Sequence, residues 1–314
     1  MSKEENSVSD MEKMLEQLKT MTDGKDSDFA EQIAKMEKLI EAKKKDIYSN
    51  LTPWETVKIA RHPKRPVLDD YIKLLFSDFI ELHGDRRFAD DRALIGGFAR
   101  IDGQSIMLIG HNKGKNVDEN VERNFGMAKP EGYRKALRLM KLAEKFNVPI
   151  VTFIDTPGAY PGLEAEERGQ AEAIARNLVE MAQLKVPIIC LVTGEGGSGG
   201  ALGIGVGDSI LMLSNSVYSV ISPEGCASII WRDGAMAERA AEALKVTASS
   251  LKELGVIDEI IEEPTGGAHQ DYRTTVASIR KVLLRYLKKY KGNSESKLLK
   301  KRFEKYSKIG VFNK

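Results

Sequence analysis

The residues with the clearest chemical signature are glycines gathered in two short segments. One segment, DTPGAYPG, spans residues 155–162, and the other, GEGGSGGA, spans residues 194–201. Each follows an apolar, strand-like stretch that begins with Val-Pro-Ile, at 148–150 and at 186–188. Glycine lets the backbone come close to a ligand, and N–H groups at the start of a helix lack intrahelical acceptors. The two segments therefore predict backbone N–H donors arranged as an oxyanion hole.

A purely structural role fits the same glycines, because a short helix packs closely on a sheet where no side chain intervenes. From the residues alone the two interpretations are equally supported. The functional one carries large consequences, since removing a single oxyanion-hole donor typically costs on the order of 3 kcal/mol of transition-state stabilisation.

The second segment also matches a dinucleotide-binding fingerprint, with Gly194, Gly196 and Gly199 in G-x-G-x-x-G spacing. That motif must open a crossover helix and be followed about 20 residues later by an acidic residue. Only the eight residues GALGIGVG separate Gly199 from the next apolar strand, and Ser214 and Asn215 stand where the acid should be. A nicotinamide site is therefore rejected.

The tetrapeptide DTPG at 155–158 resembles a switch element of GTPases. A GTPase also needs G-x-x-x-x-G-K followed by Ser or Thr. The chain has Gly-Lys pairs at Gly24-Lys25 and Gly114-Lys115, and Asp and Asn follow them. The GTPase interpretation is rejected as well.

Helices and strands alternate around the two glycine segments. Apolar spacing predicts helices over 131–146 and 166–184, and buried strands within 147–159, 185–197 and 208–214. A helix of crossover length between apolar strands indicates a parallel α/β sheet with right-handed connections. Ligands of such sheets bind outside the carboxyl ends of the strands, where both glycine segments fall.

The N-terminal part of the chain predicts other elements. Residues 1–47 indicate two amphipathic helices separated by the polar segment TDGKDSD, and a partner or a second copy could cover their apolar faces. Three prolines make 51–66 an irregular connection, and a helix is expected near 68–82. Asp102-Gly103 between two apolar runs is a strong hairpin signal.

The composition limits the class of protein. The 314 residues include 48 Lys+Arg and 46 Asp+Glu, so a net charge of +2 gives no strong signal for nucleic-acid binding. Residues 280–314 hold 13 basic and 2 acidic residues at helical apolar spacing. We expect an amphipathic helix docked on the body; an acidic partner or ligand phosphates are the alternative.

Metal, secretion and membrane signals are missing. The cysteines Cys190 and Cys226 lack C-x-x-C spacing, and the four histidines lack metal-ligand spacing, so no metal site is expected in this chain. The N-terminus lacks the apolar core of a signal peptide, and no apolar run approaches the roughly 20 residues of a membrane span. A cytoplasmic location is expected.

Longer stretches resemble a known family. The segments PWETVKIARHPKRP, ELHGDRRFADDRALIGGFARIDG, IGHNKGK, RNFGMAKPEGYRKALRLMKLAEKF and FIDTPGAYPGLEAEERGQAEAIARNL are similar to the alpha subunit of the bacterial acetyl-CoA carboxylase carboxyltransferase. ERAAEALKVTASSLKELGVIDEIIEEP, at 238–264, resembles the crotonase-type fold. The resemblance covers about residues 30–290 and implies an α/β, crotonase-like fold of repeated β-β-α units. Domains are then expected at 51–290, with a helical extension over 1–50 and a basic tail over 291–314.

The resemblance also implies the activity. The family transfers the carboxyl group of N1-carboxybiotin, held on a biotin carboxyl carrier protein, to acetyl-CoA, and the malonyl-CoA formed serves fatty-acid synthesis. The biotin ureido oxygen and the thioester oxygen of the acetyl enolate both become oxyanions, so two oxyanion holes are needed. The implied biotin-side hole uses backbone N–H groups of Gly158 or Ala159 in the first segment and of Gly199 and Gly200 in the second.

The implied assembly is larger than this chain. A beta subunit bearing a zinc ribbon and most of the acetyl-CoA site completes an α₂β₂ complex, which works with biotin carboxylase. Zinc is expected only on that partner, and carboxybiotin is not attached to this chain.

Other polar residues are weaker candidates. Tyr160 either lines a biotin slot or merely packs. Five cations form a basic loop that meets CoA phosphates or the carboxylate of carboxybiotin, or else is solvated charge: Lys113, Lys115, Arg123, Lys129 and Arg134. Glu164 and Glu195 flank the glycine segments and are either helix caps or general bases. A general base would favour a self-sufficient crotonase-type hydratase or isomerase, and a third possibility is a catalytically silent scaffold for the beta subunit.

Overall fold

The computed structural model describes residues 11, 13–20 and 27–310. The chain divides into two compact units, Met1–Thr52 and Pro53–Lys314. No helix of the described ranges is long and apolar enough to cross a lipid bilayer.

The first unit is helical. Residues 13–20 form one helix, and α2 (Ser27–Ser49) is the other. Lys19 and Glu37 join the two helices through an ion pair of 2.6 Å. The two predicted amphipathic helices are therefore confirmed, and residues 22–26 of the polar segment between them lie outside the described ranges.

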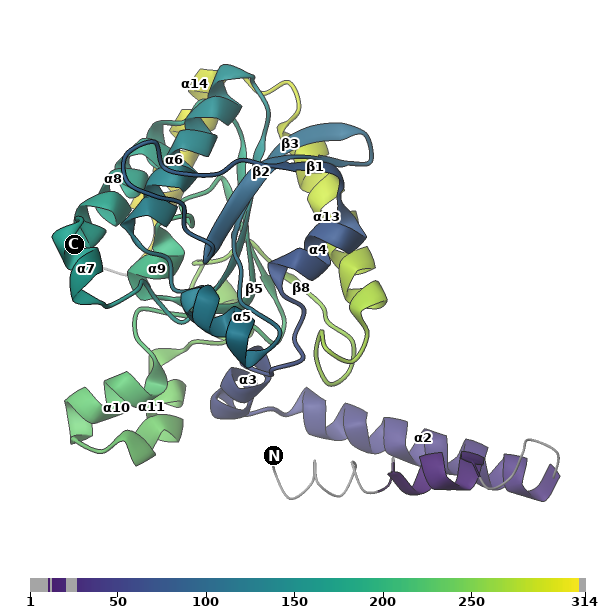
Figure 1. Cartoon of the computed structure of the whole chain (residues 1–314). Coiled ribbons are helices and arrows are strands. Elements are labelled where there is room, and N and C mark those ends of the chain that lie inside the picture. Colours follow the sequence, from purple (N-terminus) through teal and green to yellow (C-terminus); the bar gives the residue numbers. More distant parts are fainter. Residues whose placement is uncertain (1–10, 12, 21–26, 311–314) are drawn as a thin grey trace. The chain divides into compact units, whose positions relative to one another are not determined.

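An eight-stranded sheet forms the centre of the second unit (Figure 1). The strands are β1 (Ser77–Glu81), β2 (Leu94–Ile101), β3 (Gln104–His111), β4 (Ile150–Thr156), β5 (Ile188–Gly197), β6 (Ser209–Leu213), β7 (Val217–Ser219) and β8 (Glu259–Ile261). Their order is β1-β2-β3-β4-β5-β6-β8, and β7 pairs with the end of β5.

The sheet combines antiparallel and parallel strands. β1, β2 and β3 are antiparallel, and β3, β4, β5, β6 and β8 are parallel. Asp102 and Gly103 join β2 to β3 with φ of +47° and +76°, the left-handed conformation that a tight hairpin turn requires. The predicted hairpin and the predicted parallel strands are confirmed.

Helices cover both faces of the sheet. The helices of the second unit are α3 (Pro53–Ala60), α4 (Leu68–Leu75), α5 (Val117–Glu122), α6 (Pro130–Lys145), α7 (Leu163–Glu167), α8 (Gln170–Gln183), α9 (Ser198–Leu202), α10 (Pro223–Trp231), α11 (Ala237–Leu244), α12 (Ala248–Glu253), α13 (Tyr272–Tyr290) and α14 (Glu295–Ser307). Figure 1 shows α6 and α8 on one side of the sheet and α4 and α13 on the other. Because successive strand residues point to opposite faces, Ile150 and Ile154 of β4 enter the core beneath α6 and α8, whereas Val151 and Phe153 enter the core beneath α4 and α13.

One predicted element is wrong in extent. The helix expected near 68–82 ends at Leu75, and Phe76 is already extended, with φ −116° and ψ 154°. Residues 77–81 form β1 instead, because pairing with β2 satisfies their backbone groups at the edge of the sheet. Local helical spacing cannot anticipate that long-range pairing.

Part of the basic C-terminal charge is buried. Arg302 of α14 is 1% exposed, and its guanidinium pairs with Asp208 at 2.7 Å. The same group donates hydrogen bonds of 2.7 Å to the carbonyl oxygens of Met181 and Leu184. These bonds tie α14 to the end of α8 and to the start of β6.

Candidate active site

The two glycine segments lie side by side at the carboxyl ends of neighbouring strands. β4 and β5 are parallel, and Thr156 stands opposite Gly196 in their register. β5 continues through Gly197 before α9 begins, so the second segment is strand in its first half and helix in its second. The sequence placed both segments at this edge of the sheet, and the structure brings them there.

The segments touch through their backbones. A β-carbon at Gly200 would lie 2.4 Å from the carbonyl carbon of Gly158, and one at Gly197 would lie 2.1 Å from the carbonyl oxygen of Pro157. Both distances are far below van der Waals contact, so only glycine fits at these two positions. Ser198 takes the left-handed conformation, with φ of +49°, where the strand turns into the helix.

Three N–H groups at the contact remain available as donors. The Gly158 N–H donates to the Thr156 hydroxyl oxygen at 3.2 Å, and that hydroxyl donates to the Gly158 carbonyl at 2.7 Å. The Ala159 N–H has no acceptor in the described part of the chain. Gly199 and Gly200 are the second and third residues of α9, where N–H groups have no intrahelical acceptor. The pair Gly158 and Ala159 thus offers one free donor, that of Ala159.

An apolar groove opens beside the second segment. It has a volume of about 520 Å³ and begins at Ser198 and Gly199. Its apolar walls come from residues in or next to α9, β7, α11 and α12 and from the end of the described chain: Leu202, Val220, Leu244, Leu251, Val256 and Ile309. A ligand could place its hydrocarbon part against these side chains and its charged oxygen at the N–H groups.

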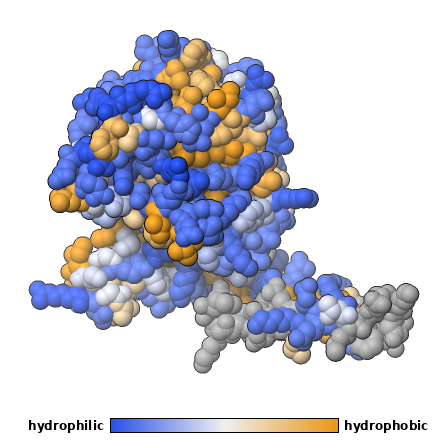
Figure 2. Space-filling model, viewed as in Figure 1, coloured by the Kyte–Doolittle hydropathy of each residue, from blue (hydrophilic) through white to orange (hydrophobic). Residues whose placement is uncertain are grey.

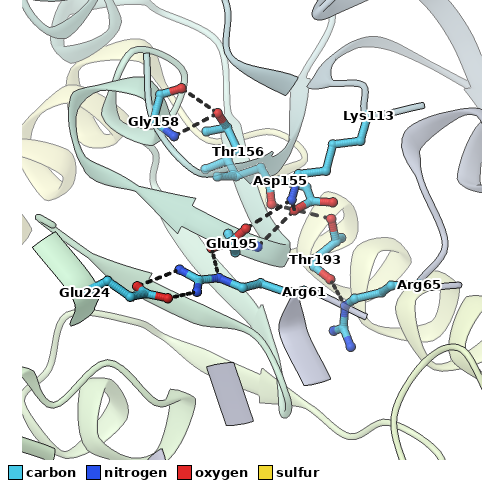
Figure 3. A network of polar contacts seen from close by, with 10 residues as sticks. Arg61, Arg65, Lys113, Asp155, Thr156, Gly158, Thr193, Glu195 and Glu224 are labelled. Atoms are coloured by element: carbon cyan, nitrogen blue, oxygen red, sulfur yellow. Dashed lines mark hydrogen bonds and ion pairs between the residues drawn. The ribbon is translucent and has the colours of Figure 1, made fainter. Parts of the chain in front are cut away.

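A chain of buried and half-buried charged side chains lies beneath the glycine segments (Figure 3). Asp155 Oδ1 accepts hydrogen bonds from Lys113 Nζ at 2.7 Å and from the Glu195 N–H at 2.9 Å. Lys113 Nζ also lies 3.4 Å from Glu195 Oε2, and Arg61 Nε donates to Glu195 Oε1 at 2.6 Å. Arg61 continues to Glu224 at the start of α10, with an ion pair of 2.5 Å. Asp155 belongs to the first segment and Glu195 to the second, so these bonds fix the segments against each other.

The charges in this network stabilise one another. Burial alone would raise the pKa of Glu195, but Lys113 and Arg61 outweigh it and hold that pKa below its usual value. Burial would lower the pKa of Lys113, and Asp155 and Glu195 raise it instead. Glu195 is therefore an ion-paired carboxylate at neutral pH, a poor general base.

A second buried pair supports β5 from the other side. Arg65 donates to the Thr193 carbonyl at 2.7 Å and pairs with Glu263 at 2.6 Å. The side chains of Arg65 and Glu263 are 3% and 0% exposed. This pair holds β5 in place at Thr193, directly before Gly194.

The five predicted cations are not gathered into one loop site. Each has a carboxylate partner: Lys113 with Asp155, Lys115 with Asp70, Arg123 with Asp69, Lys129 with Glu164, and Arg134 with Asp85. Lys113 and Lys115 share a cavity of about 370 Å³ that reaches Pro157. Arg134 lines a different cavity, and Arg123 and Lys129 line neither.

Tyr160 and Glu164 lie at the outer end of the first segment. The Tyr160 ring is 4.7 Å from the Lys129 ammonium, and its backbone N–H donates to Ala128. The backbone N–H of Glu164 itself and the Tyr160 hydroxyl hold the pKa of Glu164 below its usual value. Glu164 is therefore also ionised at neutral pH.

Sequence reasoning missed three members of the charged network. Arg61 and Glu224 carried no assignment, and Asp155 was considered only within the GTPase-like tetrapeptide. The sequence does contain a signal for Asp155. A carboxylate at the end of a buried strand needs a positively charged or hydrogen-bonding partner, so its position alone indicates such a contact. Arg61 lies 134 residues from Glu195 and 163 from Glu224, so no local pattern joins them.

Solved structures establish the class of fold. Transcarboxylase 12S matches with a TM-score of 0.60 at 20% identity, over 76% of this chain and 44% of the other. The beta subunit of geranyl-CoA carboxylase from P. aeruginosa matches with a TM-score of 0.56 at 19% identity, over 84% of this chain and 48% of the other. A chain of a Pseudomonas malonate decarboxylase hetero-tetramer in complex with coenzyme A matches with a TM-score of 0.57 at 18% identity, over 69% of this chain and 86% of the other. The second unit therefore has the crotonase-type fold of the acyl-CoA carboxyltransferases, and the chain spans less than half of the first two proteins.

Sequence relatives define the family more closely. The family described as acetyl co-enzyme A carboxylase carboxyltransferase-like matches residues 1–310. The acetyl-coenzyme A carboxylase carboxyl transferase subunit alpha of Halalkalibacterium halodurans is 56% identical over 98% of this chain and 95% of its own length. The protein of that name from a Geobacillus species is 57% identical over 98% of this chain and 95% of its own length. The chain belongs to the family of acetyl-CoA carboxylase carboxyltransferase alpha subunits, which confirms the resemblance and the expected fold.

Proposed function

We propose that this chain supplies the biotin-side oxyanion hole of an acetyl-CoA carboxylase carboxyltransferase. The N–H groups of Ala159, Gly199 and Gly200 donate to the ureido oxygen of biotin as negative charge develops there. The carboxyl group passes from N1-carboxybiotin, held on its carrier protein, to the methyl carbon of acetyl-CoA, which gives malonyl-CoA. The observation that carries this proposal is the contact between the two glycine segments, with N–H donors left free on both.

The charged network positions these donors in our proposal. Asp155 and Glu195 hold the two segments in register, and each carboxylate is matched by Lys113 or Arg61. Donors fixed before the reaction need no reorganisation when charge develops, which is how backbone N–H groups lower a barrier. The apolar groove beside Gly199 suits the hydrocarbon part of the carrier-bound biotin.

A partner subunit is the second part of the proposal. The chain covers 44% and 48% of the matched chains of two neighbours, but 86% of one chain of a hetero-tetramer, which supports the view that it is one half of a carboxyltransferase. Large apolar side chains are exposed next to the glycine segments and on α10, among them Val220 (74%), Ile229 (73%) and Ile230 (61%). Figure 2 shows apolar surface on the lower-left lobe, where Figure 1 places α10 and α11. A beta subunit with its own zinc site, in an α₂β₂ complex, would cover such surface and supply the acetyl-CoA side.

The remaining cellular context follows from the same proposal. Biotin carboxylase reloads the biotin carboxyl carrier protein, and the whole system works in the cytoplasm. Cys190 and Cys226 are both free and buried, which is compatible with a reducing compartment.

The test is reconstitution. Malonyl-CoA formation from carboxybiotin and acetyl-CoA is measured with this chain alone, with a purified beta subunit alone, and with both. We expect activity only in the mixture. Full activity of this chain alone would refute the need for a partner and would favour a self-sufficient crotonase-type enzyme.

The general-base alternative has its own test. A hydratase or isomerase that uses Glu164 or Glu195 as its base would lose activity by orders of magnitude when either becomes Gln. We expect Glu164→Gln to retain carboxyl transfer within a few-fold, because Glu164 lies outside the N–H contact. The scaffold alternative predicts that disrupting the glycine contact leaves the rate unchanged once the complex has formed.

A further inference from the structure

A third cavity, separate from the glycine segments, is lined by five arginines. It has a volume of about 270 Å³ and lies between the loop that joins β1 to β2 and the helices α6 and α8. Five arginines and two carboxylates contribute to its lining, which leaves three positive charges uncompensated. An uncompensated positive cavity is the typical setting of an anion site.

The two carboxylates are already used by two of the arginines. Arg134 Nε donates to Asp85 at 2.7 Å, and Arg176 Nε donates to Glu172 at 2.6 Å. Asp85 also accepts the backbone N–H groups of Arg87 and Phe88, at 2.8 and 2.7 Å. Neither carboxylate bonds directly to the side chains of the three remaining arginines in the described part of the chain.

The other three arginines have no carboxylate partner within the described ranges. The Arg138 guanidinium donates to the carbonyl oxygens of Gly84 and His83, both at 3.0 Å. Arg86 donates to the His83 carbonyl at 2.7 Å, and the side chain of Arg87 makes no hydrogen bond or ion pair there. Arg86 and Arg138 thus converge on one carbonyl group, and neither forms an ion pair with a carboxylate in the described part of the chain.

The positive charges of Arg86 and Arg138 oppose each other. Burial and the nearby charge of Arg86 hold the pKa of Arg138 below its usual value. An anion between these guanidinium groups would remove the repulsion and accept several N–H bonds at once. Guanidinium groups match phosphate oxygens in paired geometry, which favours phosphate over other anions.

We propose that Arg86, Arg87 and Arg138 bind the phosphate group of a small phosphorylated ligand. The cavity is smaller than the roughly 300–1,000 Å³ of pockets that enclose a whole drug-sized ligand, so it takes the phosphate part and leaves the rest outside. The ligand is either free phosphate or diphosphate, or a nucleotide-bearing molecule such as CoA. The site does not depend on the glycine segments, so it stands or falls separately from the proposed carboxyl transfer.

Binding of defined probes to the full chain tests the proposal. Inorganic phosphate, pyrophosphate, CoA and dephospho-CoA are titrated by calorimetry into wild type and into Arg87→Gln, Arg138→Gln and Arg100→Gln. Arg100→Gln is the matched control. Arg100 is exposed on β2, so this substitution removes one positive charge at a place away from the cavity. We expect one pyrophosphate per chain, with binding about tenfold weaker in Arg87→Gln and Arg138→Gln and unchanged in the control.

The comparison of probes identifies the source of the phosphate. Tighter binding of CoA than of dephospho-CoA, lost in Arg87→Gln, indicates the nucleotide phosphate; binding of phosphate and pyrophosphate alone indicates a free anion. The exposed Arg87 side chain makes no hydrogen bond or ion pair in the described structure, so we expect Arg87→Gln to keep the fold even if Arg138→Gln does not. The proposal is overturned if no probe binds, or if Arg87→Gln binds pyrophosphate as tightly as Arg100→Gln does.

Discussion

Replacing Gly200 by alanine tests whether the contact between the glycine segments is essential. The added β-carbon would lie 2.4 Å from the Gly158 carbonyl carbon and 2.5 Å from the Ala159 nitrogen. Ordinary van der Waals contact begins near 3.4 Å, so the first segment must move by about 1 Å. Both clashing atoms are backbone, so no side-chain rotation relieves the clash.

The expected effects on catalysis and on stability are of similar size. Overpacking of this kind costs about 1–3 kcal/mol of unfolding free energy. A displacement of about 1 Å at positioned donors costs about 10²-fold in rate. We therefore expect Gly200→Ala to remain folded and to assemble with the beta subunit, while its carboxyl-transfer rate falls by about 10²-fold.

Gly234→Ala is the matched control. A β-carbon at Gly234 meets only the Ser228 hydroxyl at 3.4 Å, which is an ordinary contact. Thermal unfolding and malonyl-CoA formation with the partner subunit are measured for both variants. If Gly200→Ala has the same carboxyl-transfer rate and the same stability as Gly234→Ala, close backbone contact does not set the donor geometry.

Three further predictions concern the surroundings of the site. Asp155→Asn removes the charge opposite Lys113 and should lower the unfolding free energy in urea by about 1.5–3 kcal/mol; a loss below 0.5 kcal/mol, roughly the low end for a neutral hydrogen bond, would contradict the role of the network. His111 is 1% exposed, and burial together with Lys113 lowers its pKa to about 3, so the unfolded chain takes up a proton below pH 6.5 that the folded chain does not. Its contribution to stability should therefore decline by up to about 1.4 kcal/mol per unit as the pH falls from 6.5 towards 3, and the difference between wild type and His111→Leu should change with pH over that range rather than stay constant. Arg302→Gln leaves Asp208 buried without its partner and should cost about 3–5 kcal/mol, with faster amide exchange in α14; unchanged exchange there would show that Arg302 does not hold the helix.

The sequence was most informative where local pattern decides structure. The apolar strands and the helix between them predicted β4, α8 and β5 because buried parallel strands and amphipathic helices have distinct periodicities. Asp102-Gly103 predicted the β2–β3 hairpin because few residue pairs adopt its left-handed turn. The placement of both glycine segments at one edge followed from the parallel order alone.

The sequence could not give the features that depend on distant partners. Helical spacing near 68–82 did not reveal β1, whose pairing partner lies beyond an intervening loop. The five cations of the expected basic loop each pair with a carboxylate that only the fold brings near, and no local pattern reveals these partners. Conversely, Arg86 and Arg138 are 52 residues apart by number and converge only because the β1–β2 loop folds over α6.

The most direct measurement removes a single N–H donor without changing any side chain. Replacing Ala159 by lactic acid through semisynthesis converts the peptide bond after Gly158 into an ester, which keeps the side chain and eliminates the free N–H. The matched change at Gly158 removes an N–H that already bonds to Thr156. With the beta subunit present, we predict that the Ala159 ester lowers the carboxyl-transfer rate by about 10²–10³-fold, and the Gly158 ester by far less. A wild-type rate for the Ala159 ester would contradict the oxyanion hole on which the proposed function depends.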